Sequence, residues 1–224
     1  LRSMTTAEEM RRLAPAENTY EKLCSIIDDC TVKGPQMSSY DMCLGDYQFL
    51  LYKLRIVTYG SEYQINTKCP ICRTPSTETI NLEDLLVRTF DEEVFEKYHE
   101  LVLPVTQSKV TLKMVTPRML DEVAASMKTF NRKVNNENLN SSILFSISNI
   151  IDTIDGKKPN PITLEEFVRT LPMRDTNMIS NYSDKLSNML GIDTNITIRC
   201  GFCGSENKSR LSMTSEFFRP SLDE

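Results

Sequence analysis

The sequence contains no tryptophan, a single histidine and only seven glycines among its 224 residues. With one histidine, a Ser-His-Asp catalytic triad is excluded everywhere except around His99. No glycine-rich phosphate loop is present, because Gly156-Lys157-Lys158 lacks the spacing of that motif. We therefore expect His99 to be a surface or packed residue, and we expect neither enzymatic activity nor a small-molecule substrate.

Long hydrophobic runs and a strong positive charge are also missing. The longest uncharged stretch, Asn138 to Ile151, is rich in Ser and Asn and is shorter than the roughly 20 apolar residues of a membrane span. Leu1 to Ser3 precede Met4, where we expect the native chain to begin, and no signal peptide follows. We expect no membrane association. The net charge of −5 and pI near 5.2 argue against extensive nucleic-acid binding.

Four of the seven cysteines form two Cys-x-x-Cys pairs, Cys69-Pro70-Ile71-Cys72 and Cys200-Gly201-Phe202-Cys203. Each pair places two thiolates on one tight turn, and two such turns supply the four sulfurs of a closed tetrahedral zinc site. We predict that Cys69, Cys72, Cys200 and Cys203 bind one structural Zn²⁺. Iron, which binds to similar turns, and ordinary free thiols are the alternatives.

The other three cysteines, Cys24, Cys30 and Cys43, belong to no such pair. A disulfide framework normally has an even number of cysteines in a shorter secreted chain. We expect these three to be reduced, buried, small apolar residues of a cytosolic protein.

The flanks of both cysteine pairs have the pattern of β-strands. Apolar and polar residues alternate over 62–68 before the first pair, and the chain returns at 77–80. Ile196 and Ile198 precede the second pair, and residues 210–213 are the expected return strand. Strand, cysteine turn and strand on each side predict a zinc ribbon that a long insertion divides into two halves.

Helical spacing of apolar residues dominates the remainder of the chain. The predicted fold class is α+β: a split four-cysteine zinc ribbon with N-terminal helices and a large, mainly helical insertion. We assign residues 4–60 to the N-terminal helical segment, residues 61–82 and 194–214 to the split ribbon, and residues 83–193 to the insertion.

Local signals predict several helix ends. Thr116-Pro117 is expected to begin a helix, since Thr caps well and Pro suits the first turn. Apolar spacing predicts another helix over 141–154, and Asp175 is expected to cap the last one. Asn81 is expected to cap a short helix over 82–87.

One helix is predicted from about Asp46 to Tyr59-Gly60. Lys53 and Arg55 are expected to point towards solvent or a partner. The inner face is expected to hold Phe49, Leu50, Leu54 and Val57.

Five basic residues lie near the cysteine turns: Lys68, Arg73, Arg199, Lys208 and Arg210. Zinc ribbons are common in transcription machinery, so a zinc-ribbon nucleic-acid-binding or transcription factor is the alternative function. A merely solvated face is the simpler explanation of these charges.

The stretch Asp46-Tyr47-Gln48-Phe49-Leu50-Leu51-Tyr52-Lys53-Leu54-Arg55, followed by Gly60 and the first cysteine pair, resembles a family of tailed-phage proteins. These are the baseplate hub subunits and hub assembly proteins of T4-like bacteriophages. The C-terminal Phe217-Phe218-Arg219-Pro220 is similar to the ends of such proteins. The resemblance covers roughly residues 40–85 and 194–220.

The resemblance implies a non-enzymatic protein that is needed to assemble the hub of a contractile-tail baseplate. It is either a structural subunit of the virion or an assembly chaperone in the host cytoplasm, and its partners are other phage baseplate hub proteins. The helix that carries the resemblance is expected to face a partner or to hold the frame together. The candidate partner-binding residues are Asp46, Phe49, Lys53, Arg55, Phe217 and Phe218.

Overall fold

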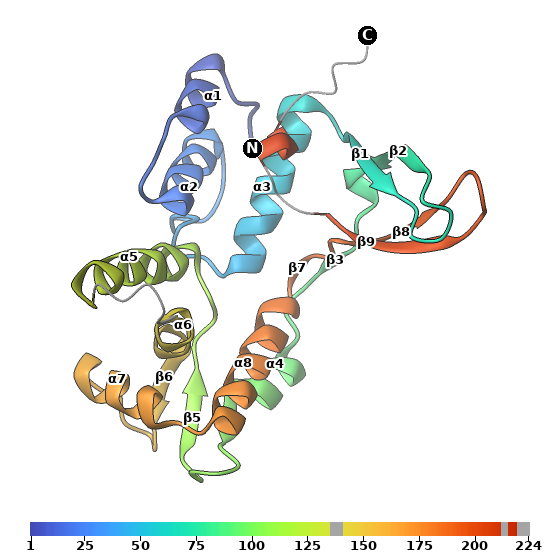
Figure 1. The fold of residues 1–224 in the computed structure, drawn as a ribbon. Coiled ribbons are helices and arrows are strands. Elements are labelled where there is room, and N and C mark those ends of the chain that lie inside the picture. The colour runs from blue at the N-terminus through green and yellow to red at the C-terminus, as the bar shows by residue number, and fades with distance from the viewer. Residues whose placement is uncertain (135–140, 212–214, 219–224) are drawn as a thin grey trace.

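The computed structural model describes residues 1–134, 141–211 and 215–218. It contains both helices and sheets, so the α+β expectation is confirmed. Figure 1 shows three parts: a group of N-terminal helices, a β-rich arm that extends to one side, and a larger, mainly helical insertion. Every helix of the described residues is too short or too polar to span a bilayer.

The N-terminal part consists of α1 (Thr6–Leu13), α2 (Thr19–Cys30) and α3 (Leu44–Tyr59). A capping box between Thr5 and Glu8 begins α1. Helix α3 ends at the C-cap Gly60, and the sequence predicts this end correctly. Gly60 has a φ of 87°, which glycine adopts without steric cost. Asp46 lies in the first turn of α3 and is not its cap, because the helix begins two residues earlier.

The arm, residues 62–81 and 195–210, consists of two antiparallel hairpins (Figure 1). Strand β1 (Glu62–Lys68) pairs with β2 (Pro75–Asn81), and β8 (Asn195–Arg199) pairs with β9 (Glu206–Arg210). The alternation predicted over 62–68 is confirmed by the alternating exposure of β1. The second return strand begins earlier than the predicted 210–213, and residues 212–214 lie outside the described part of the chain.

A short ladder, the neck, joins the arm to the insertion. Strand β3 (Val87–Arg88) pairs antiparallel with β7 (Gly191–Ile192), and Arg88 forms an ion pair of 2.5 Å with Asp193. The helix predicted over 82–87 is therefore wrong beyond its first turn: Asn81 caps only the 3₁₀ turn η1 (Leu82–Asp84). The chain then becomes extended because it pairs with a strand that lies far away in the sequence.

The insertion places helices around a three-stranded sheet of order β4-β5-β6. Its strands are β4 (Glu100–Val102), β5 (Lys109–Leu112) and β6 (Ile151–Ile154). Its helices are α4 (Glu92–His99), α5 (Pro117–Val134), α6 (Ser142–Ile150), α7 (Pro161–Thr170) and α8 (Met173–Asn188). The predicted start of α5 at Thr116-Pro117 is confirmed.

Two helix predictions within the insertion are wrong. The helix predicted over 141–154 ends at Ile150, because residues 151–154 pair with β5 and leave the helical conformation. Asp175 does not cap α8, which begins at Met173. Its carboxylate is fully buried and accepts the backbone N–H groups of Val105 and Thr106, both at 2.9 Å, so it anchors the loop before β5.

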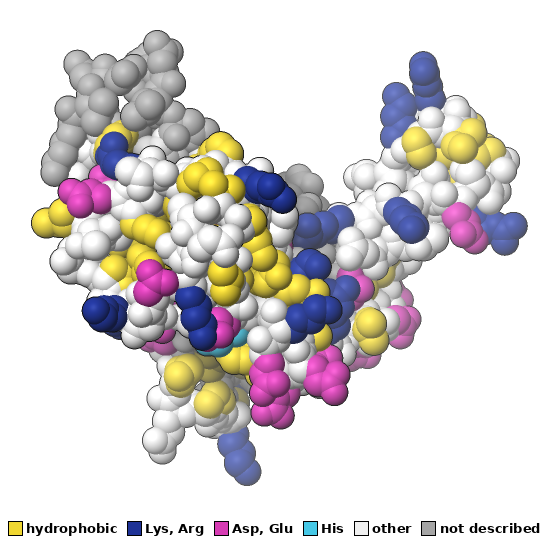
Figure 2. Space-filling model, turned by 90° about the horizontal axis from the view of Figure 1, so that it is seen from below, with side chains coloured by type: hydrophobic (Ala, Val, Ile, Leu, Met, Phe, Trp, Pro, Cys, Tyr) yellow, Lys and Arg dark blue, Asp and Glu magenta, His cyan; other side chains and the backbone are white. Residues whose placement is uncertain are grey.

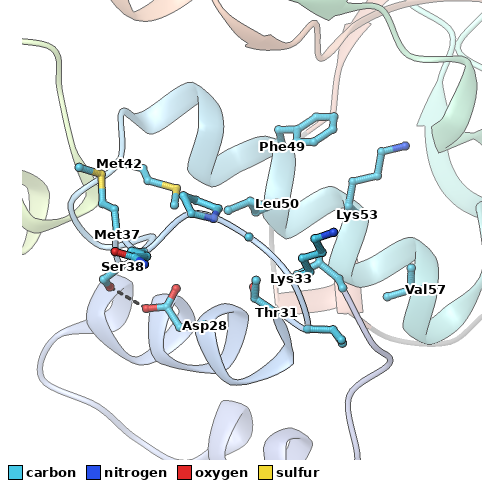
Figure 3. Close-up of a pocket in the computed structure, with 15 residues that line it drawn as sticks. Asp28, Thr31, Lys33, Met37, Ser38, Met42, Phe49, Leu50, Lys53 and Val57 are labelled. Atoms are coloured by element: carbon cyan, nitrogen blue, oxygen red, sulfur yellow. Dashed lines mark hydrogen bonds between the residues drawn. The ribbon is translucent and has the colours of Figure 1, made fainter.

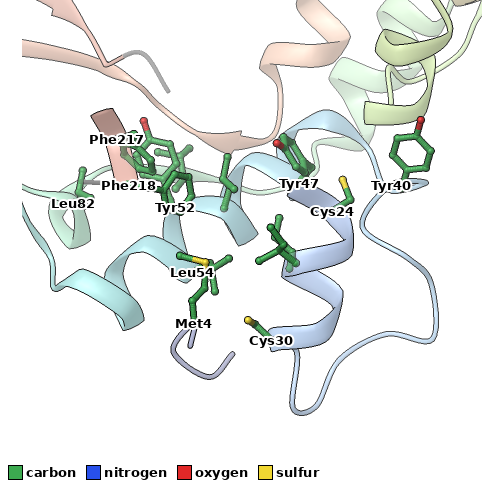
Figure 4. Packing of buried hydrophobic residues seen from close by; sticks show 14 of the residues in the cluster. Met4, Cys24, Cys30, Tyr40, Tyr47, Tyr52, Leu54, Leu82, Phe217 and Phe218 are labelled. Atoms are coloured by element: carbon green, nitrogen blue, oxygen red, sulfur yellow. The ribbon is translucent and has the colours of Figure 1, made fainter. Parts of the chain in front are cut away.

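The molecule has two hydrophobic cores. The first lies between α2 and α3 and includes Met4 and the C-terminal Phe217 and Phe218 (Figure 4). The second lies within the insertion, around Val110, Ile151 and Ile179. The insertion therefore has its own buried apolar surface, although both of its ends return to the neck.

Helix α3 contacts the neck at its first turn. A Cβ atom placed on Gly191 would lie 2.8 Å from the Cα of Gly45, and Gly191 has a φ of 98°. Only glycines allow two backbones to approach this closely. This contact fixes the neck, and with it the base of the arm, against the N-terminal helices.

Candidate metal centre

The two hairpins of the arm bring together the four cysteines of the Cys-x-x-Cys pairs. Cys69 and Cys72 lie on the turn between β1 and β2, and Cys200 and Cys203 lie on the turn between β8 and β9. All four sulfur atoms lie within 4.8 Å of one another. Residues separated by the entire insertion thus converge at one point near the end of the arm.

The two turns have the same backbone geometry. The N–H of Cys69 donates to the carbonyl of Thr74 at 3.1 Å, and that of Arg73 donates to the carbonyl of Cys69 at 2.9 Å. In the second turn, Cys200 donates to Ser205 and Gly204 to Cys200, both at 2.9 Å. The residue after the second cysteine is left-handed in both, with φ of 60° at Arg73 and 71° at Gly204.

The sulfur separations fit a tetrahedral metal ion. Cys69 Sγ lies 3.7 Å from Cys203 Sγ, and Cys72 Sγ lies 3.7 Å from Cys200 Sγ. Zn–S bonds of about 2.3 Å place the sulfurs of a tetrahedron about 3.8 Å apart. The four cysteines can therefore hold one metal ion, and with four protein ligands a tetrahedral ion has no position left for water.

Polar groups around two of the four sulfurs, those of Cys69 and Cys203, favour the anionic form, whereas the neighbouring thiols raise the pKa of Cys200. The Ser205 hydroxyl, 3.3 Å from Cys69 Sγ, and the backbone N–H groups of Cys72 and Ile71 lower the pKa of Cys69 to about 5. The same hydroxyl lies 3.1 Å from Cys203 Sγ and lowers the pKa of that thiol. Metal ions bind to thiolates, so these contacts prepare the site for a cation.

The three remaining cysteines have different surroundings. Cys24 and Cys30 are fully buried, and burial raises the pKa of Cys24 to about 12. Both are therefore unreactive interior residues, as predicted. Cys43 is only half-buried, and its thiol donates to Asp46 at 2.8 Å.

His99 is a packed residue. Its Nδ1 lies 2.8 Å from the carbonyl oxygen of Leu112, and its ring stacks on that of Phe95 at 4.6 Å. These contacts join the end of α4 to β5, which gives the ring a structural role.

Arg55 does not point towards solvent or a partner, which corrects the prediction. Its side chain is fully buried, and its guanidinium donates to the backbone carbonyls of Gly60, Glu62 and Phe217. A signal for this was present in the sequence: Arg55 follows Leu51 and Tyr47 at intervals of four residues, on the same face of α3.

Phe217 and Phe218 are also buried in this chain, with 0% and 5% of their surface exposed. The Phe217 ring packs against Tyr52 at 4.7 Å (Figure 4). It also packs against Tyr63 at 5.4 Å. The guanidinium of Arg12 lies 5.1 Å from the ring centre of Phe218. These two rings close the chain's own core, so in this structure they are not accessible to a partner.

The remaining candidates, Asp46, Phe49 and Lys53, also lie on α3, and Phe49 packs partly against the first core. Asp46 is exposed, and Phe49 and Lys53 are half-buried. Val57, which was predicted to face inwards, is 43% exposed. The structure thus distinguishes these residues from Arg55, which shares the helix but is fully buried.

The comparisons with known proteins give one match. A family model described as T4 bacteriophage base plate protein matches residues 1–219. No curated protein and no solved structure matches the chain.

Proposed function

The chain belongs to the T4 bacteriophage base plate protein family, and from this premise we propose that it is a non-enzymatic component of the baseplate hub. It acts in the host cytoplasm during assembly by binding other hub proteins. It either remains in the virion as a structural subunit or leaves as an assembly chaperone.

The family match over residues 1–219 is the observation that carries this proposal, because it includes the N-terminal helices, the arm and the insertion. The hub assignment within that family rests on the resemblance of residues 46–55 and the first cysteine turn to hub proteins. Proteins of such an assembly act through surfaces, and the arm provides one that stands away from the body (Figure 2).

Copurification tests the hub assignment. The tagged full-length chain is coexpressed with the complete set of baseplate proteins, and we expect it to capture at least one hub protein. Capture of none of them contradicts the proposal. Mass spectrometry of finished particles then separates the two roles, since only a structural subunit is retained.

We further propose that the four-cysteine centre is a zinc ribbon that binds one structural Zn²⁺. The support is its donor set, its matched turns and its sulfur separations, which leave no open position for catalysis. Ile198 and the two inner cysteines, Cys69 and Cys200, are the most buried side chains of the arm. Only the base of the arm reaches a larger core, where Tyr63, Ile65, Ile80 and Ile196 pack against the first one. Isolated two-stranded hairpins are marginally stable, so the ion supplies the missing stabilisation.

Replacing one ligand tests the zinc proposal. We expect Cys72→Ser or Cys203→Ser to lower the bound metal well below one ion per chain and to lower the melting temperature. Cys43→Ser is the matched control, because Cys43 is half-buried but lies outside the centre. Elemental analysis and thermal unfolding are the measurements. Equal melting temperatures for Cys72→Ser and the parent chain exclude a structural role for the metal, and bound iron excludes zinc.

A nucleic-acid-binding role is the second candidate, favoured by the basic residues of the arm. Lys68, Arg73, Arg199, Lys208 and Arg210 are all exposed, and within the described part of the chain none of them forms an ion pair. A mobility-shift titration at low salt tests this role. Binding that falls steeply with added salt supports it, and the absence of any shift at micromolar protein excludes it.

A further inference from the structure

Helix α3 places apolar side chains both in the first core and at a surface groove. Tyr47, Leu51 and Leu54 face the first core and are almost fully buried. Phe49, Leu50 and Val57 line a surface groove at the edge of this face. Phe49 and Leu50 are half-buried and also pack against the first core, whereas Val57 is 43% exposed. The groove thus leaves apolar surface of α3 uncovered, and an exposed apolar patch of this kind marks a binding site.

The groove runs between α3 and the loop of residues 31–38, and it has a volume of about 930 Å³ (Figure 3). The loop contributes Val32 and Met37, which are 75% and 56% exposed. Phe49 and Val57 are eight residues apart, which corresponds to about 12 Å along the helix axis. The apolar floor therefore matches the length of a helix of two to three turns.

Two lysines give the groove its charge. Lys33 from the loop and Lys53 from α3 both lie on the half of the groove near Val57, whereas Met37 and Met42 lie at the other end (Figure 3). Asp28 also lines the groove, but its carboxylate accepts the hydroxyl of Ser38 at 2.6 Å and the N–H of Ser39 at 2.9 Å. Among the described residues, no carboxylate forms an ion pair with either lysine.

We propose that this groove binds an amphipathic helix of another baseplate hub protein, with the apolar face of that helix on α3 and its acidic side chains at Lys33 and Lys53. A helix and a loop border the groove, so it presents no strand edge for an added β-strand. The flexible side chains of Met37 and Met42 adapt to an apolar face. The proposal rests on the proposed function, because it takes the partner from the hub.

Site-specific crosslinking tests the occupant. A photoreactive phenylalanine replaces Val57 in the full-length chain, which is coexpressed with the complete set of baseplate proteins. We expect crosslinks to one hub protein, within a helical segment that contains Asp or Glu. The same probe at Ile162 on α7, which is 72% exposed, is the control and should not crosslink to that segment. Crosslinks from position 57 to a second copy of the chain, or to a segment without acidic residues, overturn the proposal.

Charge reversal tests the two lysines. We expect Lys33→Glu with Lys53→Glu to weaken capture of the crosslinked partner about tenfold or more, because opposite charges become like charges at the interface. Reversal of the crosslinked acidic residues to Lys should restore capture. Lys157→Glu with Lys158→Glu, two exposed lysines of the insertion, is the matched control.

The outcomes separate this inference from the proposed function. If the parent chain captures no hub protein, the proposed function fails. If the parent chain captures a hub protein and the double variant Lys33→Glu with Lys53→Glu captures it equally well, only the groove proposal fails. An unchanged melting temperature shows that the double variant is folded.

Discussion

Arg55 joins three segments of the chain through backbone carbonyls. Its guanidinium reaches the end of α3 at Gly60, the start of β1 at Glu62 and the C-terminal segment at Phe217. No carboxylate pairs with it among the described residues, and burial lowers its pKa. The side chain therefore acts as a multiple hydrogen-bond donor that holds the frame, which is one of the two roles predicted for this helix.

We expect Arg55→Met to lower the free energy of unfolding by about 2 to 3 kcal/mol, because the three carbonyls lose their donors. Urea unfolding is the measurement. Lys53→Met, on the outer side of the same helix, should change stability little. Equal stabilities of the two variants would show that water replaces the guanidinium without cost.

Glu8 connects the start of α1 to the segment that precedes it. The guanidinium of Arg2, 2.7 Å away, and the hydroxyl and N–H of Thr5 lower the pKa of Glu8 from 4.5 to about 2. Between about pH 4.5 and pH 2 the unfolded chain therefore binds more protons than the folded chain at this position. The stability that Glu8 contributes is present above this window and is lost as the pH falls through it.

We predict that Glu8→Gln loses less stability than the parent chain when the pH is lowered from 5 to 3. Urea unfolding at both pH values provides the comparison. Glu17→Gln removes an exposed carboxylate and should keep the pH dependence of the parent chain. If Glu8→Gln loses as much stability as the parent chain between pH 5 and pH 3, the contacts of the Glu8 carboxylate with Arg2 and Thr5 do not form in solution.

At the scale of elements, the contact of α3 with the neck determines where the arm stands. Gly45 and Gly191 allow the helix and β7 to touch backbone to backbone, and the Arg88–Asp193 ion pair closes the other side of the neck. Asp121 of α5 adds a second connection, since its carboxylate accepts the N–H of Glu21 at 2.9 Å at the start of α2. The insertion is thus attached to the N-terminal part both at the neck and through α5.

Two glycines with positive φ provide a matched test of the neck. Gly191→Ala and Gly156→Ala both place a side chain in a left-handed conformation, but only Gly191 has other atoms within 4 Å of the added Cβ. We expect Gly191→Ala to be more destabilising than Gly156→Ala by about 1 to 3 kcal/mol, the usual cost of overpacking. Chemical denaturation measures the difference. Similar losses of stability in the two variants would mean that the neck can move away from α3 without a cost in free energy.

At the scale of the whole molecule, the four-cysteine cluster and the neck each bring together the two ends of the segment that contains the insertion. The insertion has the neck and a core of its own, whereas in the proposed zinc ribbon the arm is stabilised by the ion that its four cysteines bind. Closing a long loop costs free energy that grows only logarithmically with its length, so the size of the insertion is no obstacle to either closure.

Removal of the metal should therefore act locally. We expect a chelator, added to reduced protein, to increase amide hydrogen exchange in β1, β2, β8 and β9, while β5 and α8 stay protected. Hydrogen-exchange mass spectrometry with and without chelator is the measurement. Loss of protection in α8 together with the arm would show that the metal stabilises the whole molecule rather than one part of it.

The sequence by itself determined the features whose causes are local. Cys69 with Cys72, and Cys200 with Cys203, have the spacing that one turn requires, and alternation over 62–68 identified β1. Gly60 and Thr116-Pro117 marked helix ends through their own backbone preferences.

Only the tertiary structure decided the features that depend on contacts between distant residues. Arg55 is buried because Phe217 and the start of β1 supply acceptors, and Phe217 is buried because Tyr52 and Tyr63 surround it. Residues 151–154 form a strand because β5 offers hydrogen-bonding groups, although their apolar spacing suits a helix. The convergence of the two cysteine turns belongs here as well, since spacing within each turn says nothing about the distance between them.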